Sequence, residues 1–375
     1  MAATPIRIGV VGLDHWYWAF SFAGAVSRHP EALIVAVADA DVKRAGVYAR
    51  RYGVDRTTAR VHELLNDESI DLIASFISVD QNPAVCIAAA RSGKHMLSVK
   101  PLARTLDEAG RIRDAVHAAG VHFIPAETTW RLSEQNQQLR AWVADGRLGT
   151  MLTGNFSLWS SLPRSWPNEG EQVMSWPQIP GCDQGTSWLD DDTSAPRPAI
   201  AGPGWYVDPA RAPGGAWIDH SVYQVALLRW LLDDEVREVA GHVRRLKYPD
   251  LAVEDYGIGT IELKRGAIVT IENTWTAPRG AFRFSMSLTG TAGAVTYDSI
   301  SGRLGLAGAF RPFTGWVEAA PRTLYNTGLD HLIAVVRDEE QPIATVDDAW
   351  RTLAVCRAFY ESAETGRAVV PQTLD

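Results

Sequence analysis

A lysine and an aspartate–tyrosine pair are the residues of this 375-residue chain best suited to proton-transfer chemistry. Lys100 precedes Pro101, which biases the lysine backbone towards an extended conformation at the end of an apolar run. Asp219 and Tyr223 are four residues apart in a stretch with helical character, so they share one helix face. Oxidation of an alcohol needs a base for the hydroxyl proton while hydride leaves the carbon, and this set could supply one.

Two side chains are candidates for that base. Tyr223 could accept a proton only if nearby positive charge, such as that of Lys100, lowers its pKa from about 10. His220 projects about 100° round the helix from Asp219, so it reaches the same ligand only if the helix is rotated or its first turn is irregular. Asp219 and His220 could begin a metal site together with Glu127 or His331, but no ligand spacing supports one, and we predict no metal.

A second cluster predicts a dinucleotide site. An apolar, β-branched run over residues 6–12 ends at Gly12, but Asp14 and Tyr17 occupy the other glycine positions of G-x-G-x-x-G. A carboxylate about 4 Å from a phosphate costs up to about 4 kcal/mol at an effective dielectric constant near 20, so Asp14 must point away from a bound pyrophosphate. Asp39 ends the second predicted strand, where it would accept hydrogen bonds from ribose hydroxyls and repel a 2′-phosphate. The cofactor is therefore expected to be NAD rather than NADP.

The pattern of apolar runs predicts two α/β domains. Strands at 6–12, 33–38, 72–77, 95–99 and 122–125 alternate with helices at 16–29, 42–52, 83–92 and 105–119, which is typical of a Rossmann doubly wound parallel sheet over residues 1–125. Residues 126–375 form the second domain, an α/β unit with a large open, mainly antiparallel sheet, because β-rich stretches separated by turns fill 239–300. Helical spacing returns over 329–365.

A loop-rich stretch over residues 159–215 carries several tryptophans together with Asp190, Asp191 and Asp192. Flat aromatic faces can stack on sugar rings, and carboxylates can accept hydrogen bonds from hydroxyls, so a carbohydrate-like ligand fits. The same tryptophans could instead fill the core or subunit interfaces.

Overall composition excludes some classes of partner. A formal charge of −8 provides no basic field for nucleic acid. The chain shows neither a membrane-spanning run nor a signal-peptide pattern, so the expected location is the cytoplasm, with no membrane partner. Three scattered cysteines suggest neither a disulfide framework nor a zinc site.

Several segments together resemble the glucose-fructose oxidoreductase / inositol dehydrogenase / MocA (Gfo/Idh/MocA) family of NAD(P)-dependent sugar and polyol dehydrogenases. Residues 93–103 resemble its G-K-H-V-x-x-E-K-P-L-A segment, and residues 214–224 resemble its G-G-x-x-x-D-x-G-x-H segment. Residues 290–293 resemble its G-T-x-G turn, and residues 130–131 and 146–149 also match. Two departures lie at the site: Val99 replaces the family glutamate, and Tyr223 stands where the family usually has its catalytic histidine.

The resemblance implies an oxidoreductase that acts on a sugar, polyol or related hydroxylated small molecule, and a homodimer or homotetramer associated through the open sheet. The implied catalytic residues are Lys100, Asp219, Tyr223 and His220. The implied cofactor-binding residues are Gly12, Leu13, Asp14, His15, Asp39, Ser78 and Lys100. The implied substrate-binding residues are Trp130, Arg131, Trp159, Trp205, Asp219 and His220.

Two alternatives keep the fold but change the function. In the first, NAD is retained and recycled or is replaced by a metal, in an isomerase, lyase or glycosidase-like reaction. In the second, the chain is a ligand-binding or partner subunit without turnover and with a degenerate cofactor site.

Overall fold

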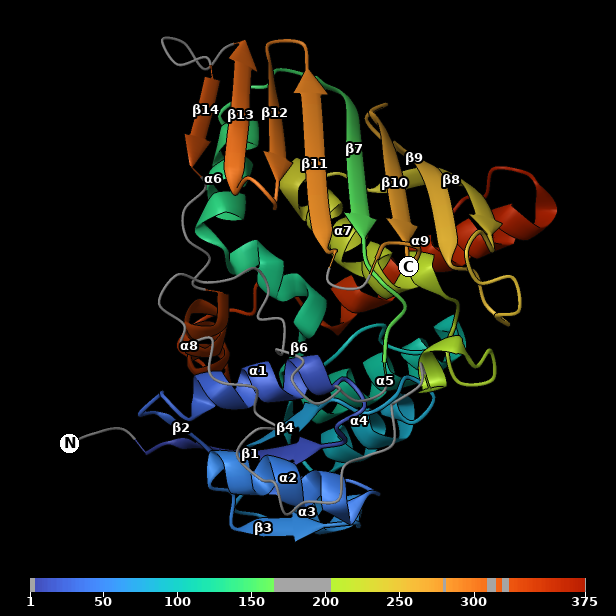
Figure 1. Cartoon of the computed structure of the whole chain (residues 1–375). Coiled ribbons are helices and arrows are strands. Elements are labelled where there is room, and N and C mark those ends of the chain that lie inside the picture. The colour runs from blue at the N-terminus through green and yellow to red at the C-terminus, as the bar shows by residue number, and fades with distance from the viewer. Residues whose placement is uncertain (1–3, 165–203, 279–280, 309–314, 319–323, 375) are drawn as a thin grey trace.

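The computed structural model describes residues 4–164, 204–278, 281–308, 315–318 and 324–374. These residues form a parallel sheet with flanking helices and, above it in Figure 1, a larger sheet with helices on one face. The predicted α/β fold class is confirmed. Within the described residues, no helix is long and apolar enough to cross a membrane.

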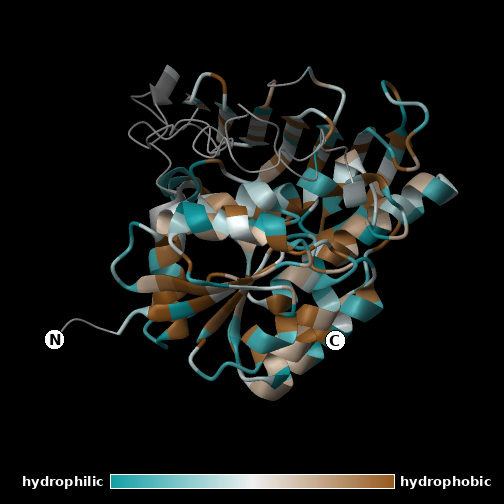
Figure 2. Ribbon diagram, turned by 60° about the horizontal axis from the view of Figure 1, so that its bottom comes forward, coloured by the Kyte–Doolittle hydropathy of each residue, from teal (hydrophilic) through white to brown (hydrophobic). Residues whose placement is uncertain are grey.

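The first sheet is a doubly wound parallel sheet of six strands. Its elements are β1 (Ile6–Val11), α1 (Trp16–Val26), β2 (Ala32–Ala38), α2 (Val42–Tyr52), β3 (Arg56–Thr58), α3 (Val61–Leu65), β4 (Leu72–Ser75), α4 (Asn82–Arg91), β5 (His95–Ser98), α5 (Leu106–Ala119) and β6 (Phe123–Pro125). The strand order is β3-β2-β1-β4-β5-β6, so the carboxyl ends of all six strands share one edge. Figure 2 shows the apolar strands enclosed between helices.

Local signals explain most of these elements. Asp41 caps α2 by accepting hydrogen bonds from the backbone of Lys43 and Arg44, and Gly53 ends the helix with φ of 67°. Helix α1 ends at Val26 rather than at residue 29 as predicted, because Pro30 disfavours a helical conformation at the residue before it. The sequence analysis missed β3 and α3, since both are short and β3 is polar and mostly exposed.

The second sheet has eight strands in the order β14-β13-β12-β11-β7-β10-β9-β8. Its elements are η1 (Ala126–Leu132), α6 (Glu134–Ala144), β7 (Met151–Trp159), η2 (Gly204–Val207), α7 (Ala216–Leu232), β8 (Val236–Arg244), β9 (Tyr256–Leu263), β10 (Ile268–Thr274), β11 (Arg283–Gly290), β12 (Gly293–Asp298), β13 (Arg303–Gly308), β14 (Gly315–Glu318), α8 (Leu324–Val336) and α9 (Val346–Thr365). Every neighbouring pair is antiparallel except β7 and β10. The sheet is therefore mixed and mainly antiparallel.

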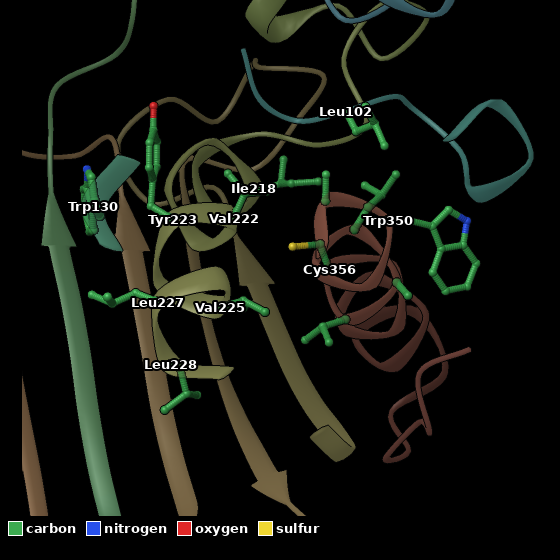
Figure 3. Packing of buried hydrophobic residues seen from close by; sticks show 14 of the residues in the cluster. Leu102, Trp130, Ile218, Val222, Tyr223, Val225, Leu227, Leu228, Trp350 and Cys356 are labelled. Carbon is green, nitrogen blue, oxygen red and sulfur yellow. The ribbon is translucent and has the colours of Figure 1, made fainter. Parts of the chain in front are cut away.

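Helices α7 and α9 pack on one face of this sheet. Figure 3 shows Val222 and Val225 of α7 among the buried side chains between the sheet and α9. Trp217 of α7 stacks on Phe359 of α9 with ring centroids 3.5 Å apart. Helix α7 is buried on nearly all sides, and this holds its first turn against the edge of the parallel sheet.

The C-terminal helices also return to the first domain. Helix α8 packs on α1, and Leu329, Leu332 and Ile333 belong to the same apolar cluster as the strands of the parallel sheet. Helix α9 contacts α5 and β6. The chain therefore crosses between the two sheets more than once, and these crossings fix the position of one sheet relative to the other.

A substitution at Gly12 tests why the turn that joins β1 to α1 needs a glycine. Its φ is +74°, and an added Cβ would lie 2.7 Å from Cα of Ile77. Gly53 has a similar φ of +67° but nothing within 4 Å of an added Cβ. We expect Gly53→Ala to cost the left-handed backbone penalty of about 1–2 kcal/mol. Gly12→Ala adds a clash with backbone, so calorimetry should show a larger fall in Tm for this variant. Equal falls would contradict this account.

Candidate active site

The site centres on an ion pair between the two domains. Lys100 follows β5 at the carboxyl edge of the parallel sheet, and Asp219 lies in the first turn of α7. The lysine side chain is 2% exposed, and its Nζ donates to Oδ1 of Asp219 at 2.5 Å and to the backbone carbonyl of the same residue. Oδ2 of Asp219 accepts from Nε1 of Trp275 at 3.1 Å. Burial alone would raise the pKa of Asp219, but Lys100 holds it well below its usual range. The carboxyl is therefore ionised.

Tyr223 lies one helical turn beyond Asp219, as predicted, and its ring lies 5.2 Å from Nζ of Lys100. Its hydroxyl accepts from Nε1 of Trp18 at 2.8 Å, and its ring stacks on Trp130 with centroids 4.9 Å apart (Figure 3). Burial, with a smaller contribution from Tyr17, raises the pKa of Tyr223 well above 10. The lowered pKa that a tyrosine base requires is thus not seen, because burial dominates the shift.

His220 lies beside the same carboxylate. Its Nδ1 is 3.4 Å from Oδ2 of Asp219, so the two side chains meet although the residues are adjacent along the helix. That His220 reaches the same ligand as Asp219 stays a prediction. Burial lowers the pKa of His220 to about 4, so the imidazole is neutral near pH 7. A neutral imidazole can accept a proton, whereas the phenol of Tyr223 already carries one.

The carboxylate of Asp14, in the loop after β1, is held by two donors. Oδ2 of Asp14 accepts from the backbone nitrogen of Ser78 at 2.8 Å, and Oδ1 accepts from Nη2 of Arg44 at 3.0 Å. The same guanidinium pairs with Oδ2 of Asp39 at 2.7 Å. Burial raises the pKa of Asp39, and Arg44 opposes that shift. Arg44 therefore lies between the carboxylates of Asp14 and Asp39 and offsets part of their negative charge. That Asp14 points away from a bound pyrophosphate stays a prediction.

Two bulky side chains of the loop after β1, those of His15 and Tyr17, lie close to residues of the second domain. His15 is fully buried, its backbone nitrogen donates to the carbonyl of Phe76, and its ring centroid lies 4.9 Å from that of Trp205. Burial lowers the pKa of His15 to about 4. Tyr17, at the third glycine position, has its hydroxyl near those of Tyr206 and Tyr223. Leu13 is buried in the apolar cluster that includes the strands of the parallel sheet.

The predicted substrate-binding residues do not all lie together in the structure. Trp205 lies against His15, and Trp130 backs Tyr223. Arg131 instead donates to the carbonyls of Ala226 and Ile343 and pairs with Asp348, so its guanidinium links η1 to α7 and α9. Trp159 is 42% exposed at the end of β7, beneath the guanidinium of Arg283. Asp190 to Asp192, and the tryptophans within 165–203, lie outside the described residues.

Trp275 and Arg44 were not predicted to act at the site, and Glu127 was considered there only as a metal ligand. Trp275 binds Asp219, but a tryptophan after a strand carries no signal for that contact. Arg44 lies five residues after Asp39, and that spacing was the available signal. Glu127 follows β6, and the pairing of Ser98 with Pro125 places it level with Lys100. Burial raises the pKa of Glu127 to about 7. In the part of the chain that the structure describes, no three His, Cys, Asp or Glu side chains are grouped to hold a metal ion.

Comparison with known proteins gives consistent matches in both halves of the chain. Residues 6–126 match the model of the oxidoreductase family with an NAD-binding Rossmann fold, and residues 186–296 match the GFO/IDH/MocA C-terminal domain. The 1,5-anhydro-D-fructose reductase of Ensifer adhaerens is 24% identical, with 91% of each chain covered. The scyllo-inositol 2-dehydrogenase (NAD(+)) of Bacillus subtilis (strain 168) is also 24% identical, over 97% of this chain and 96% of its own. The structure of levoglucosan dehydrogenase in complex with NADH superimposes with a TM-score of 0.79 at 18% identity, over 99% of this chain and 100% of its own.

The raised pKa of Glu127 predicts how the stability of the fold depends on pH. Its pKa is about 7 in the folded state against a usual value of 4.5, so the folded state retains the proton in the interval between them. This contribution is complete below about pH 4.5 and is lost as the pH rises through about 7. We expect Glu127→Gln to lessen the fall in Tm over that interval, measured by calorimetry. The exposed Glu134→Gln should leave the profile unchanged, and parallel profiles for the wild type and Glu127→Gln would contradict the shift.

Proposed function

The chain belongs to the Gfo/Idh/MocA family of NAD-dependent oxidoreductases, and from this premise we propose that it oxidises a hydroxyl group of a sugar, a polyol or a related small molecule. The observation that carries the proposal is the buried pair of Lys100 and Asp219 at the carboxyl edge of the parallel sheet, with the neutral His220 beside it. The names of the relatives, which include inositol and levoglucosan dehydrogenases, favour this class of substrate.

The residues of the loop after β1 fit a dinucleotide. Gly12 lets the turn pack closely on the backbone of Ile77, and the Asp14 carboxylate is already held by Arg44 and Ser78. We assign Gly12, Leu13, Asp14 and Ser78 to the pyrophosphate side of the site. Asp39 is assigned to the adenosine ribose, and this favours NAD over NADP. When bound, NAD supplies the hydride acceptor.

Lys100 and Asp219 bind and orient the substrate in this proposal. A lysine ammonium has three donor hydrogens. Nζ of Lys100 uses two of them on Asp219, which leaves one for the oxygen of the reacting alcohol. Asp219 keeps the ammonium in place and fixes its direction. Charge that develops on the substrate oxygen is thereby met by a donor that needs no rearrangement.

His220 is our proposed proton acceptor, because its imidazole is neutral near pH 7 and lies against Asp219. The carboxylate would stabilise the imidazolium that forms. Tyr223 is the alternative, but its raised pKa makes the phenolate rare. We retain Trp205 as a proposed substrate contact, together with Asp219 and His220. Trp130 supports the ring of Tyr223, and we propose a structural role for Arg131.

The proposed setting is a cytoplasmic homodimer or homotetramer without nucleic-acid or membrane partners. The formal charge of −8 argues against a polyanionic partner. Among the described residues, helices α7 and α9 pack on one face of the eight-stranded sheet (Figure 1), and Trp159 and Ile268 are exposed side chains on its strands. A sheet face that is not covered by helices and carries exposed apolar side chains favours association of two copies of the chain through it.

The proposed activity predicts net reduction of NAD. Scyllo-inositol, myo-inositol and levoglucosan are tested with NAD, and 1,5-anhydro-D-fructose is tested with NADH, each followed by NADH absorbance. At least one compound should support turnover, and Lys100→Met should lower its kcat by about 100- to 1,000-fold, because a donor to the reacting oxygen is lost. The exposed Lys264→Met is the matched control and should retain kcat. Turnover without net change in NADH would favour the isomerase or lyase alternative, and no turnover with any compound would oppose the proposal.

The two candidate bases are separated by paired variants. His220→Gln should lower kcat by about 100-fold or more and should abolish the acidic limb of the kcat/KM profile, because the group with a pKa of about 4 is removed. Tyr223→Phe keeps the ring against Trp130 and should retain most of kcat. A large loss in Tyr223→Phe with a small loss in His220→Gln would transfer the role to the tyrosine. NADH binding, measured by fluorescence, verifies that each variant is folded.

A further inference from the structure

Two of the buried polar atoms that have no hydrogen-bond partner among the residues that the structure describes lie on neighbouring rings at the domain interface. They are Nε2 of His15 and Nε1 of Trp205. The two rings come from the loop after β1 and from η2, and their centroids lie 4.9 Å apart at an angle of 56°. His15 is 0% exposed and Trp205 is 5% exposed. Because buried polar atoms are almost always paired in folded proteins, two unpaired atoms on neighbouring rings indicate a place where a ligand binds.

The chemical state of His15 follows from its other contacts. Nδ1 lies 3.2 Å from the carbonyl oxygen of Ile77, which can only accept, so Nδ1 carries the proton. Burial keeps the ring neutral near pH 7. Nε2 is then an acceptor with no hydrogen of its own. Nε1 of Trp205 can only donate. The two neighbouring rings therefore carry one unpaired acceptor and one unpaired donor.

The same contacts argue against a role for His15 in binding the pyrophosphate. Its backbone nitrogen already donates to the carbonyl of Phe76 at 2.9 Å, so it offers no amide hydrogen to a phosphate. Its free ring nitrogen is an acceptor, and a phosphate oxygen is one as well. The charges of Lys100 and Asp219 both act on the imidazole, so the ring lies within electrostatic range of the proposed reacting centre.

We propose that His15 and Trp205 form a subsite for one hydroxyl group of the substrate, a hydroxyl other than the one that is oxidised. The hydroxyl donates to Nε2 of His15 and accepts from Nε1 of Trp205. An ether or carbonyl oxygen cannot donate, a carboxylate or phosphate cannot donate when ionised, and an ammonium cannot accept, so the pair fits a group that both donates and accepts, as a hydroxyl does. The inference rests on the proposed function and names a determinant of specificity within that site.

The test uses three variants of the full chain. His15→Asn keeps an amide hydrogen near the position of Nδ1, for the carbonyl of Ile77, and removes Nε2. His15→Gln instead places an amide near the position of Nε2. Trp205→Phe keeps a ring against Tyr206 and removes Nε1. The probes are the compound with the highest kcat/KM among scyllo-inositol, myo-inositol and levoglucosan, and the monodeoxy analogues of that compound.

His15→Asn and Trp205→Phe should each lower kcat/KM for the parent compound by about tenfold or more, and His15→Gln should recover part of the loss. One deoxy analogue should react equally with the wild type and with both variants, because it lacks the hydroxyl that the pair binds. The affinity for NADH, measured by fluorescence, should be unchanged. A parallel fall in NADH affinity would place the imidazole in the cofactor site and overturn the proposal, as would equal losses on the parent and every analogue.

Calorimetry separates this inference from the proposed function. Each probe is titrated into the complex of the enzyme with NADH, which needs no turnover. If no probe is oxidised but one binds, and His15→Asn weakens that binding while a deoxy analogue is unaffected, the subsite stands and the proposed reaction does not. If a probe is oxidised and its binding is insensitive to His15→Asn and Trp205→Phe, the reaction stands and the subsite is overturned. Absence of binding by every probe overturns the subsite.

Discussion

The ion pair of Lys100 and Asp219 is the interaction on which the site depends. It joins the edge of one sheet to the first turn of a helix packed on the other, and both side chains are largely buried. Removal of one partner of such a pair typically costs about 3–5 kcal/mol, because an uncompensated charge remains in the interior. The pair therefore links the two sheets, and in our proposal it also directs the ammonium of Lys100 towards the substrate.

The packing of α7 and of the C-terminal helices makes that pair possible. Helix α7 is buried on almost every side, so its first turn cannot shift without disturbing the contact between Trp217 and Phe359. Helices α8 and α9 return to the parallel sheet and couple the two halves of the chain. The positions of Asp219, His220 and Tyr223 relative to Lys100 thus follow from the cores of both domains rather than from a flexible loop.

The loop after β1 shows how substitutions at glycine positions can be accommodated. Asp14 is held by Arg44 and by a backbone amide, and the side chain of Tyr17 extends to the tyrosines of the second domain. The residues that depart from the dinucleotide fingerprint therefore make contacts of their own. In our interpretation, part of this loop contributes to substrate recognition, while Gly12 retains the turn.

Local pattern alone was sufficient to predict five of the six strands of the parallel sheet, four of the five helices α1 to α5, and the class of fold. It also predicted that Asp219 and Tyr223 share one helix face, because hydrophobic periodicity and turn residues are local properties. The resemblance to the family identified Lys100 as a candidate catalytic and cofactor-binding residue. Only the tertiary structure decided which side chains meet. It places Arg44 between Asp14 and Asp39 and Trp275 against Asp219. It also pairs Arg131 with Asp348 rather than leaving its guanidinium free for a substrate. It also decided the protonation of Tyr223 and His220, since a pKa depends on burial and on neighbours distant in the sequence.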